Sequence, residues 1–226
     1  MLQWYLMILS ITEELKNRYP GLQALVSYID DVKVAKSGDE LEVFSQEIFS
    51  EVKNKYTLDN LKDVPIFRSY RDFFWRVRID PTKVRPAAEA LIRRILAGKT
   101  IPQVNNVVDS YNLASIKTEV ALAAFNRDEL KDNLIMRKSK AVEQFLGIGM
   151  NEPTKCVGSE VVIADSEKLV AIYPHRDADT SKVTNSTRNI LLLICGVPGI
   201  DMTILNNARE HAEKYITKFC GGKNQQ

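Results

Sequence analysis

The sequence predicts a single α+β domain in which mixed or antiparallel sheets pack against helices. The first half holds segments of helical period over residues 39–55 and 85–97, whereas the second half is a series of short apolar segments separated by Gly, Asn, Asp and Pro. No stretch of the 226 residues is a linker long enough to divide the chain cleanly. Helices and strands are therefore expected to share one core.

The composition is that of an ordinary globular protein. Apolar residues make up 45% of the chain, which suffices for a core, and the formal net charge is +2. This charge is no bulk signature of nucleic-acid binding, so an RNA-binding face would have to come from local clusters. The apolar segment 4–9 is too short to cross a bilayer and has no basic leader, so we expect a cytoplasmic protein without membrane association.

The three cysteines, Cys156, Cys195 and Cys220, are widely spaced, and no Cys-x-x-Cys or Cys/His zinc spacing occurs. We therefore expect reduced thiols, no metal and no cofactor. The sequence also lacks a G-x-S-x-G elbow, a P-loop, a G-x-G-x-x-G loop and an H-E-x-x-H helix. Catalysis would have to depend on orienting water and on hydrogen bonds to developing charge.

Residues 1–84 are expected to form a strand–helix segment that completes the fold. An apolar strand over 2–9 leads to Ser10–Glu13, which has the spacing of a capping box for a short helix. A second strand is expected over 22–29. The apolar stripe of the segment 39–55 then predicts a long amphipathic helix.

The segment 66–78 (IFRSYRDFFWRVR) combines aromatic and basic side chains, and its aromatic residues have helical spacing. Aromatics interleaved with arginines can stack on bases and hold phosphates. A half-buried helix with a solvated basic edge fits the same pattern. The helix predicted over 85–97 adds further arginines, so this part of the chain is locally basic.

The second half is predicted to supply most of the strands. Apolar segments predict strands over 120–125, 134–136, 160–164, 169–173 and 189–194, and a final amphipathic helix over 203–219.

Residues 102–112 (PQVNNVVDSYN) place polar side chains within an apolar helical pattern. The polar residues are Asn105, Asn106, Asp109 and Asn112. Because residues three and four apart are neighbours on a helix, positions 105, 109 and 112 fall on one face. Such a row can bind a hydrogen-bonding ligand, or it can cap the helix and tie down a neighbouring loop.

The segment Tyr173–Asp177 (YPHRD) directly follows a predicted strand and contains His175. Working residues are common at strand-to-loop junctions, and an imidazole can act as a general base near neutral pH. The segment can instead be a turn in which Arg176 and Asp177 pair with each other or with the backbone. His211, on the last helix, is expected to be packed or solvated.

Two neighbouring segments, 100–112 (TIPQVNNVVDSYN) and 113–130 (LASIKTEVALAAFNRDEL), resemble the tRNA-editing domain of the phenylalanyl-tRNA synthetase beta subunit. They are similar to its "INNVVD…N" helix and to the strand that follows. The likeness resumes at 161–165 and 169–172 and continues through 183–184, 187 and 189–192, so it covers roughly residues 85 to 197. The chain thus resembles a free-standing relative of that domain, with residues 85–220 as the editing-domain-like core.

The resemblance implies a cavity between sheet and helices that accepts an aminoacylated tRNA end, and hydrolysis of tyrosine wrongly esterified to the phenylalanine tRNA. Three positions depart from the family pattern. The family histidine falls on Ala123, the closing aspartate on Asn126, and a charged turn, 173–179, replaces the glycine-rich one. This turn could supply a substitute histidine, His175, or fill the pocket and change its ligand.

Three functions fit the sequence: a trans-acting deacylase of a mischarged, Tyr-tRNA(Phe)-like substrate, a non-catalytic RNA-binding module, and a site for an amino acid or nucleoside relative. A tRNA partner is expected and DNA is not, while the oligomeric state stays open. For the deacylase, the predicted catalytic residues are His175 and Asp177; the predicted substrate contacts are Asn105, Asn106, Asp109, Asn112, Tyr173 and Arg176; the predicted RNA contacts are Arg71, Arg85, Arg93 and Arg94.

Overall fold

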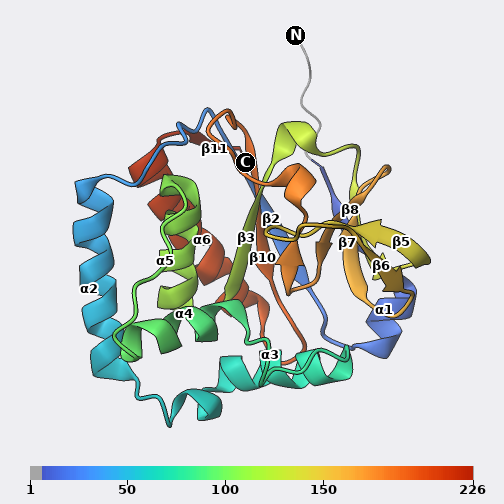
Figure 1. Cartoon of the computed structure of the whole chain (residues 1–226), viewed down its shortest axis with the longest axis horizontal. Helices are drawn as coiled ribbons and strands as arrows, with labels where there is room; N and C mark the ends of the chain where they lie inside the picture. Colours follow the sequence, from blue (N-terminus) through green and yellow to red (C-terminus); the bar gives the residue numbers. More distant parts are fainter. Residues whose placement is uncertain (1–6, 226) are drawn as a thin grey trace.

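In the computed structural model, which describes residues 7–225, a four-stranded antiparallel sheet lies at the centre of the molecule (Figure 1). Its strand order is β11-β2-β10-β3. The strands are β2 (Ala24–Asp30), β3 (Ala121–Asn126), β10 (Ile190–Cys195) and β11 (Lys223–Gln225). β10 is buried at every position and pairs with β2 on one side and β3 on the other. An early segment of the chain therefore forms an internal strand of this sheet.

A second, five-stranded sheet has the order β1-β4-β7-β8-β9. β1 pairs with β4 in parallel and the other pairs are antiparallel, so the sheet is mixed. The strands are β1 (Leu9–Ile11), β4 (Leu134–Lys138), β7 (Val161–Ala164), β8 (Leu169–Ile172) and β9 (Arg176–Asp177). The hairpin of β5 (Ala141–Phe145) and β6 (Thr154–Val157) extends from this side of the molecule (Figure 1).

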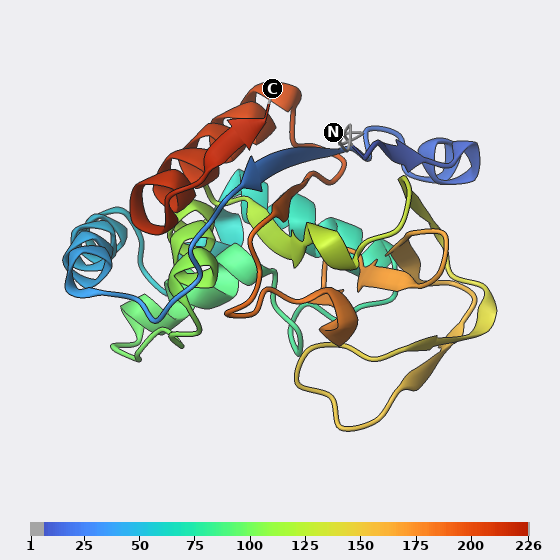
Figure 2. The same ribbon diagram turned by 90° about the horizontal axis from the view of Figure 1, so that it is seen from above.

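Helices α2, α4, α5 and α6 lie on the opposite side of the central sheet, whereas α1 lies on the side of the mixed sheet and α3 runs along the lower edge of the view in Figure 1 (Figures 1 and 2). The helices are α1 (Glu13–Arg18), α2 (Asp39–Lys55), α3 (Pro65–Arg76), α4 (Ala87–Leu96), α5 (Asn106–Thr118) and α6 (Met202–Cys220), with short 3-10 turns η1 (Leu61–Asp63), η2 (Arg127–Glu129) and η3 (Asp179–Ser181). α6 lies against β2, where the Ser27 hydroxyl donates a 2.5 Å hydrogen bond to Glu213. The arrangement confirms the predicted α+β class.

Several elements match the sequence prediction closely. α2 has the predicted bounds, and three residues of its expected stripe, Leu41, Ile48 and Val52, are buried. α4 begins two residues later than expected because Pro86 occupies its N-cap and lies outside the helix. α5 continues past residue 112 to Thr118, since the buried apolar pattern continues through Ile116.

The start of the chain differs from the prediction. Of the strand expected over 2–9, residues 2–6 lie outside the described part, and the observed strand covers 9–11. The capping box at Ser10–Glu13 is wrong, because Ser10 pairs with Ile135 in the sheet and Thr12 is the N-cap of α1. Because Ser10 lies in a strand, it does not occupy the N-cap position that a capping box requires.

Within residues 7–225, no helix combines the length and apolar composition needed to span a bilayer. The three cysteine side chains are buried and form no disulfide.

Candidate functional site

Two residues of the polar row hold the start of α5 in place. The Asn105 side chain caps the helix by accepting a 2.9 Å hydrogen bond from the Val108 N–H. The Asn106 side chain accepts from the Ala35 N–H at 2.9 Å. Its amide donates to the carbonyl oxygens of Lys33 and Phe219, at 2.9 and 3.2 Å. Both side chains are buried and use their hydrogen bonds on the protein itself.

The other two residues of the row face a cavity of about 590 Å³ between α2, the loop 98–103 and α5. The Asp109 carboxylate accepts hydrogen bonds from the Ser37 hydroxyl and the Val104 N–H. Burial raises the pKa of Asp109, although both hydrogen bonds oppose the shift. The Asn112 amide has no hydrogen-bond partner among residues 7–225, and neither His175 nor Asp177 lines this cavity.

The predicted catalytic turn joins β8 to β9. Its first residue, Tyr173, is 1% exposed, and its hydroxyl donates a 2.6 Å hydrogen bond to the Gly196 carbonyl oxygen. The His175 N–H donates to the Ile172 carbonyl oxygen at 2.8 Å, which closes the turn. Burial, with the nearby charge of Arg176, lowers the pKa of His175, so its imidazole is neutral at neutral pH.

The last two residues of the turn form β9 and pair with β8. Arg176 is exposed, and its aliphatic stem covers Gly147, where an added Cβ would lie 2.4 Å from the Arg176 Cδ. Burial raises the pKa of Asp177 to about 7. Its carboxylate makes no hydrogen bond or ion pair with any other residue in 7–225. The turn therefore presents a carboxyl group with a pKa of about 7 and without a partner among the described residues.

The charge of the β8–β9 turn acts on α5 at a residue outside the polar row. Burial raises the pKa of Tyr111 on α5, and the charge of Asp177 raises it further. Asp177 has the same effect on Cys195, at the end of β10, where burial is again the larger cause. The Tyr111 hydroxyl has no hydrogen-bond partner among the described residues. Tyr111, His175 and Asp177 thus offer polar groups that the fold itself does not use.

Tyr111 was absent from the predicted site because its spacing placed it in the apolar stripe of the helix. An aromatic residue with a polar tip can pack with its ring and still present its hydroxyl. That dual character is the only signal the sequence offered.

Two positions that depart from the family pattern lie on β3. Ala123 pairs with Leu193 of β10 and is buried. The Asn126 side chain is buried, and its Oδ1 atom has no hydrogen-bond partner in residues 7–225. The strand therefore brings only a methyl group to the position where the resemblance implies a histidine.

Of the four arginines predicted to contact RNA, two are engaged by the buried carboxylate of Glu89. Arg71 donates to it at 2.8 and 3.1 Å, and Arg93 at 2.8 Å. The Arg94 Nε–H donates to the Thr100 carbonyl oxygen at 3.0 Å. Arg85 is exposed and makes no ion pair or hydrogen bond with residues 7–225.

The second histidine of the chain is remote from this site. His211 lies on α6, where its ring packs edge-on against Tyr215 at 5.8 Å and its Nδ1 lies 2.9 Å from the Asn207 carbonyl oxygen. Among residues 7–225, no group of three His, Cys, Asp or Glu side chains is arranged to hold a metal ion.

The sequence and the fold are both similar to those of known proteins. Residues 69–221 match the sequence model of the B3/4 domain. The chain is 31% identical over 168 residues to the phenylalanine–tRNA ligase beta subunit of Fusobacterium nucleatum, a match covering 64% of this chain and 21% of that protein. The corresponding subunit of Staphylococcus haemolyticus is 28% identical over 137 residues, covering 60% and 16%.

The chain therefore spans about a fifth, or less, of the length of these curated relatives. A solved structure, an N-terminal fragment of the phenylalanyl-tRNA synthetase beta subunit from Pyrococcus horikoshii, superposes with a TM-score of 0.53 and 13% identity. This superposition covers 99% of the present chain and 52% of the fragment, so the two share a fold.

Proposed function

The chain belongs to the B3/4 domain family, and from this premise we propose that it binds the aminoacylated end of a tRNA and hydrolyses the ester of a mischarged amino acid. The similarity to phenylalanine–tRNA ligase beta subunits supports a Tyr-tRNA(Phe)-like substrate. The observation that carries the proposal is the set of unused polar groups on the β8–β9 turn, His175 and Asp177, with the hydroxyl of Tyr111 on α5, whose pKa the charge of Asp177 affects.

Asp177 is proposed as the general base. A carboxyl with a pKa of about 7 is substantially ionised at neutral pH and is basic enough to take a proton from water. The water oxygen would attack the ester carbonyl carbon while its proton passes to Asp177. The ribose oxygen would then leave and take up a proton, which releases free amino acid and tRNA.

His175 and Tyr111 are proposed to orient the water or the ester. A neutral imidazole carries one donor and one acceptor, and a phenol can donate to a developing oxyanion. Tyr173 is buried with its hydroxyl engaged, so we propose that it positions the turn and does not touch the substrate. Arg176 is exposed beside the turn, where it could hold an RNA phosphate or a substrate carbonyl.

The remaining predicted residues divide into contacts and supports. Asn112 has an unengaged amide but lines the cavity beside α2, away from the turn, so no contact with the ester is proposed for it. Asn105, Asn106 and Asp109 are proposed to support the helix start. Arg85 is the proposed phosphate contact, since Arg71, Arg93 and Arg94 are occupied by the protein.

The proposal is tested by a deacylation assay with Tyr-tRNA(Phe) and a panel of other mischarged tRNAs. We expect Asp177→Asn to lower the rate by about 10²-fold or more, which is the usual contribution of a general base. Glu167→Gln, on an exposed turn, is the matched control and should leave the rate unchanged. Failure of the wild-type chain to hydrolyse any of these substrates faster than buffer would exclude the activity.

A second candidate, a non-catalytic tRNA-binding module, is favoured by one observation: Ala123 stands where the resemblance implies a histidine. Such a module would bind tRNA in a salt-sensitive way and retain its affinity in His175→Ala. Absence of tRNA binding at low salt would exclude it. A small-ligand site for an amino acid or nucleoside is the remaining option and would appear as ligand-dependent thermal stabilisation.

A further inference from the structure

The cavity between α2, the loop 98–103 and α5 carries charged side chains at its two ends, and the proposed hydrolase does not use this cavity. Its volume is about 590 Å³, within the range of small-molecule sites. Residues of α2 and α5 supply much of its lining, and Ile95 of α4 also lines it. Two contacts show that α2 and α5 run in the same direction. Near the starts of the two helices, the charge of Glu42 acts on the Asp109 carboxylate, and near their ends Glu51 and Lys117 form an ion pair.

One end of this groove is acidic. The Glu42 carboxylate accepts hydrogen bonds from Gln46, at 3.1 Å, and from Gln103, at 2.8 Å. The Asp109 carboxylate accepts only from neutral donors, and neither carboxylate forms an ion pair among residues 7–225. Burial raises the pKa of Asp109, and the neighbouring charge of Glu42 adds to the rise. Two carboxylates therefore lie close together without a cation.

The other end is basic. Lys53 lines the groove eleven positions after Glu42 on α2, which corresponds to about 16 Å along the helix. Lys99 also lines it, at the α4 end of the loop whose other end, Gln103, contacts Glu42. Neither ammonium group forms an ion pair among the described residues. The groove thus has two unpaired cations at the end opposite its unpaired carboxylates.

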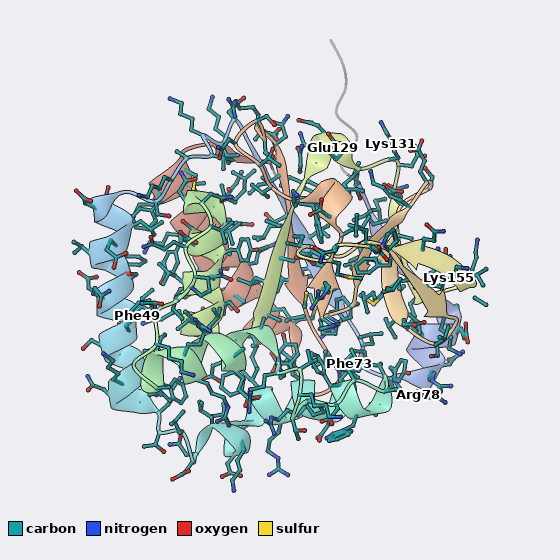
Figure 3. All side chains as sticks on the ribbon, in the orientation of Figure 1. Phe49, Phe73, Arg78, Glu129, Lys131 and Lys155 are labelled. Atoms are coloured by element: carbon teal, nitrogen blue, oxygen red, sulfur yellow. The ribbon has the colours of Figure 1, made fainter. Side chains whose placement is uncertain are left out.

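An apolar strip connects the two ends. Figure 3 shows Phe49 in the space between α2 and the α4–α5 pair. The apolar residues that line the groove are Leu41, Phe49, Ile95, Ile101, Pro102, Leu113 and Ile116. The four ionic groups sum to zero net charge, so the groove does not attract a polyanion such as RNA or a nucleotide. It suits a ligand that carries opposite charges at its two ends and apolar groups between them.

We propose that this groove binds a short peptide with free termini, its amino group toward Glu42 and Asp109 and its carboxylate toward Lys53 and Lys99. An extended tetrapeptide is about 13–14 Å long, and the charged side chains at the two ends, whose backbone positions on α2 are about 16 Å apart, can close the remaining gap to its termini. Each terminus supplies the counter-ion that the groove lacks, and apolar side chains pack along the strip. This site is independent of the β8–β9 turn and of ester hydrolysis.

The test is isothermal titration of the full chain with the peptide Ala-Leu-Leu-Ala in three forms: free, N-acetylated and C-amidated. We expect binding of the free peptide, and about tenfold weaker binding for each blocked form, the loss that one charge-assisted contact produces. Glu42→Gln should remove the preference for a free amino terminus, and Lys53→Gln the preference for a free carboxylate. Each variant should leave the other preference intact.

Glu47→Gln and Lys62→Gln, at exposed positions without partners in residues 7–225, are the matched controls and should bind like the wild type. Thermal unfolding of every variant establishes that it is folded. The proposal is overturned if no form of the peptide binds at millimolar concentration, or if a doubly blocked peptide binds as well as the free one. Tighter binding of a mononucleotide than of the peptide would also overturn it. Deacylation rates of the same variants should not change, so this result is separable from the hydrolase test.

Discussion

Asp177 lies in surroundings that disfavour its ionised form, and this has a consequence for activity. Because burial raises its pKa to about 7, the carboxylate form needed by a general base accumulates as pH passes through 7. We expect the deacylation rate to rise between pH 6 and 8 and then level off. The measurement is kcat/KM against pH. A rate that is flat over this range in the wild type would mean that another group is the base.

The same shift makes a prediction about stability. The folded pKa of Asp177 is raised from 3.8, so the folded state favours the protonated form. The stability that the protonated Asp177 carboxyl contributes is fully present below pH 4 and is lost as pH rises through about 7. The Asp177→Asn substitution removes the ionisable group. Its effect on the free energy of unfolding should therefore be more stabilising at pH 8 than at pH 4, by roughly 2–4 kcal/mol. Urea denaturation at both pH values measures this, and equal effects at the two would contradict it.

Glu89 carries a buried charge between two arginines. Its side chain is fully buried, and Arg71 and Arg93 both pair with it. Glu89→Ala would leave the two guanidinium groups without a counter-ion, so we expect a loss of roughly 3–5 kcal/mol in the free energy of unfolding. Glu47→Gln, on an exposed helix face, should change it by less than about 0.5 kcal/mol. Chemical denaturation of both variants provides the comparison.

At the scale of elements, the start of α5 is fixed by one side chain that reaches two distant segments. Asn106 bonds to the backbone of Ala35, Lys33 and Phe219, so it joins the loop before α2 to the end of α6. Asn106→Ala should cost roughly 2–4 kcal/mol and speed hydrogen exchange at the Ala35 amide. Asn105→Ala removes only a helix cap and should cost about 1 kcal/mol. Similar losses in both variants would show that the bridge contributes little.

The polar row illustrates what sequence can and cannot predict about a site. The helix itself follows from its apolar spacing, and the Asn105 cap is a local interaction. The partners of Asn106 and Asp109 lie at residues 33–37 and 219, far away in the sequence, so no local pattern could show which amides the fold consumes. Ligand-facing groups become identifiable only after those partners are assigned.

The elements missing from the prediction have a common physical feature. β5 and β6 are largely exposed and form a two-stranded sheet that covers little apolar surface, so they carry no alternating pattern. β9 has two residues and β11 three, which is too short for any periodicity. α2 was predicted with its observed bounds because one of its faces packs against the core.

At the scale of the whole molecule, the catalytic proposal depends on elements from distant parts of the sequence. The β8–β9 turn belongs to the mixed sheet, whereas α5 packs on the helical side of the central sheet (Figure 1). The sequence led to the expectation that polar residues of this helix and this turn form one site. In the structure the charge of Asp177 acts on Tyr111 of this helix, while Asp109 and Asn112 face the α2 groove.

The first part of the chain is expected to be indispensable for folding. β2 pairs with β10 along all six residues of that strand and also with β11, so it occupies an internal position in the central sheet. A fragment of residues 69–226 would leave one side of β10 and all of β11 unpaired, exposing buried apolar side chains and backbone groups. We expect this fragment to give a poorly dispersed NMR spectrum and no cooperative thermal transition. Addition of a separate 7–68 fragment should restore both if the two associate, whereas a 69–226 fragment that folds alone would show that β2 is dispensable.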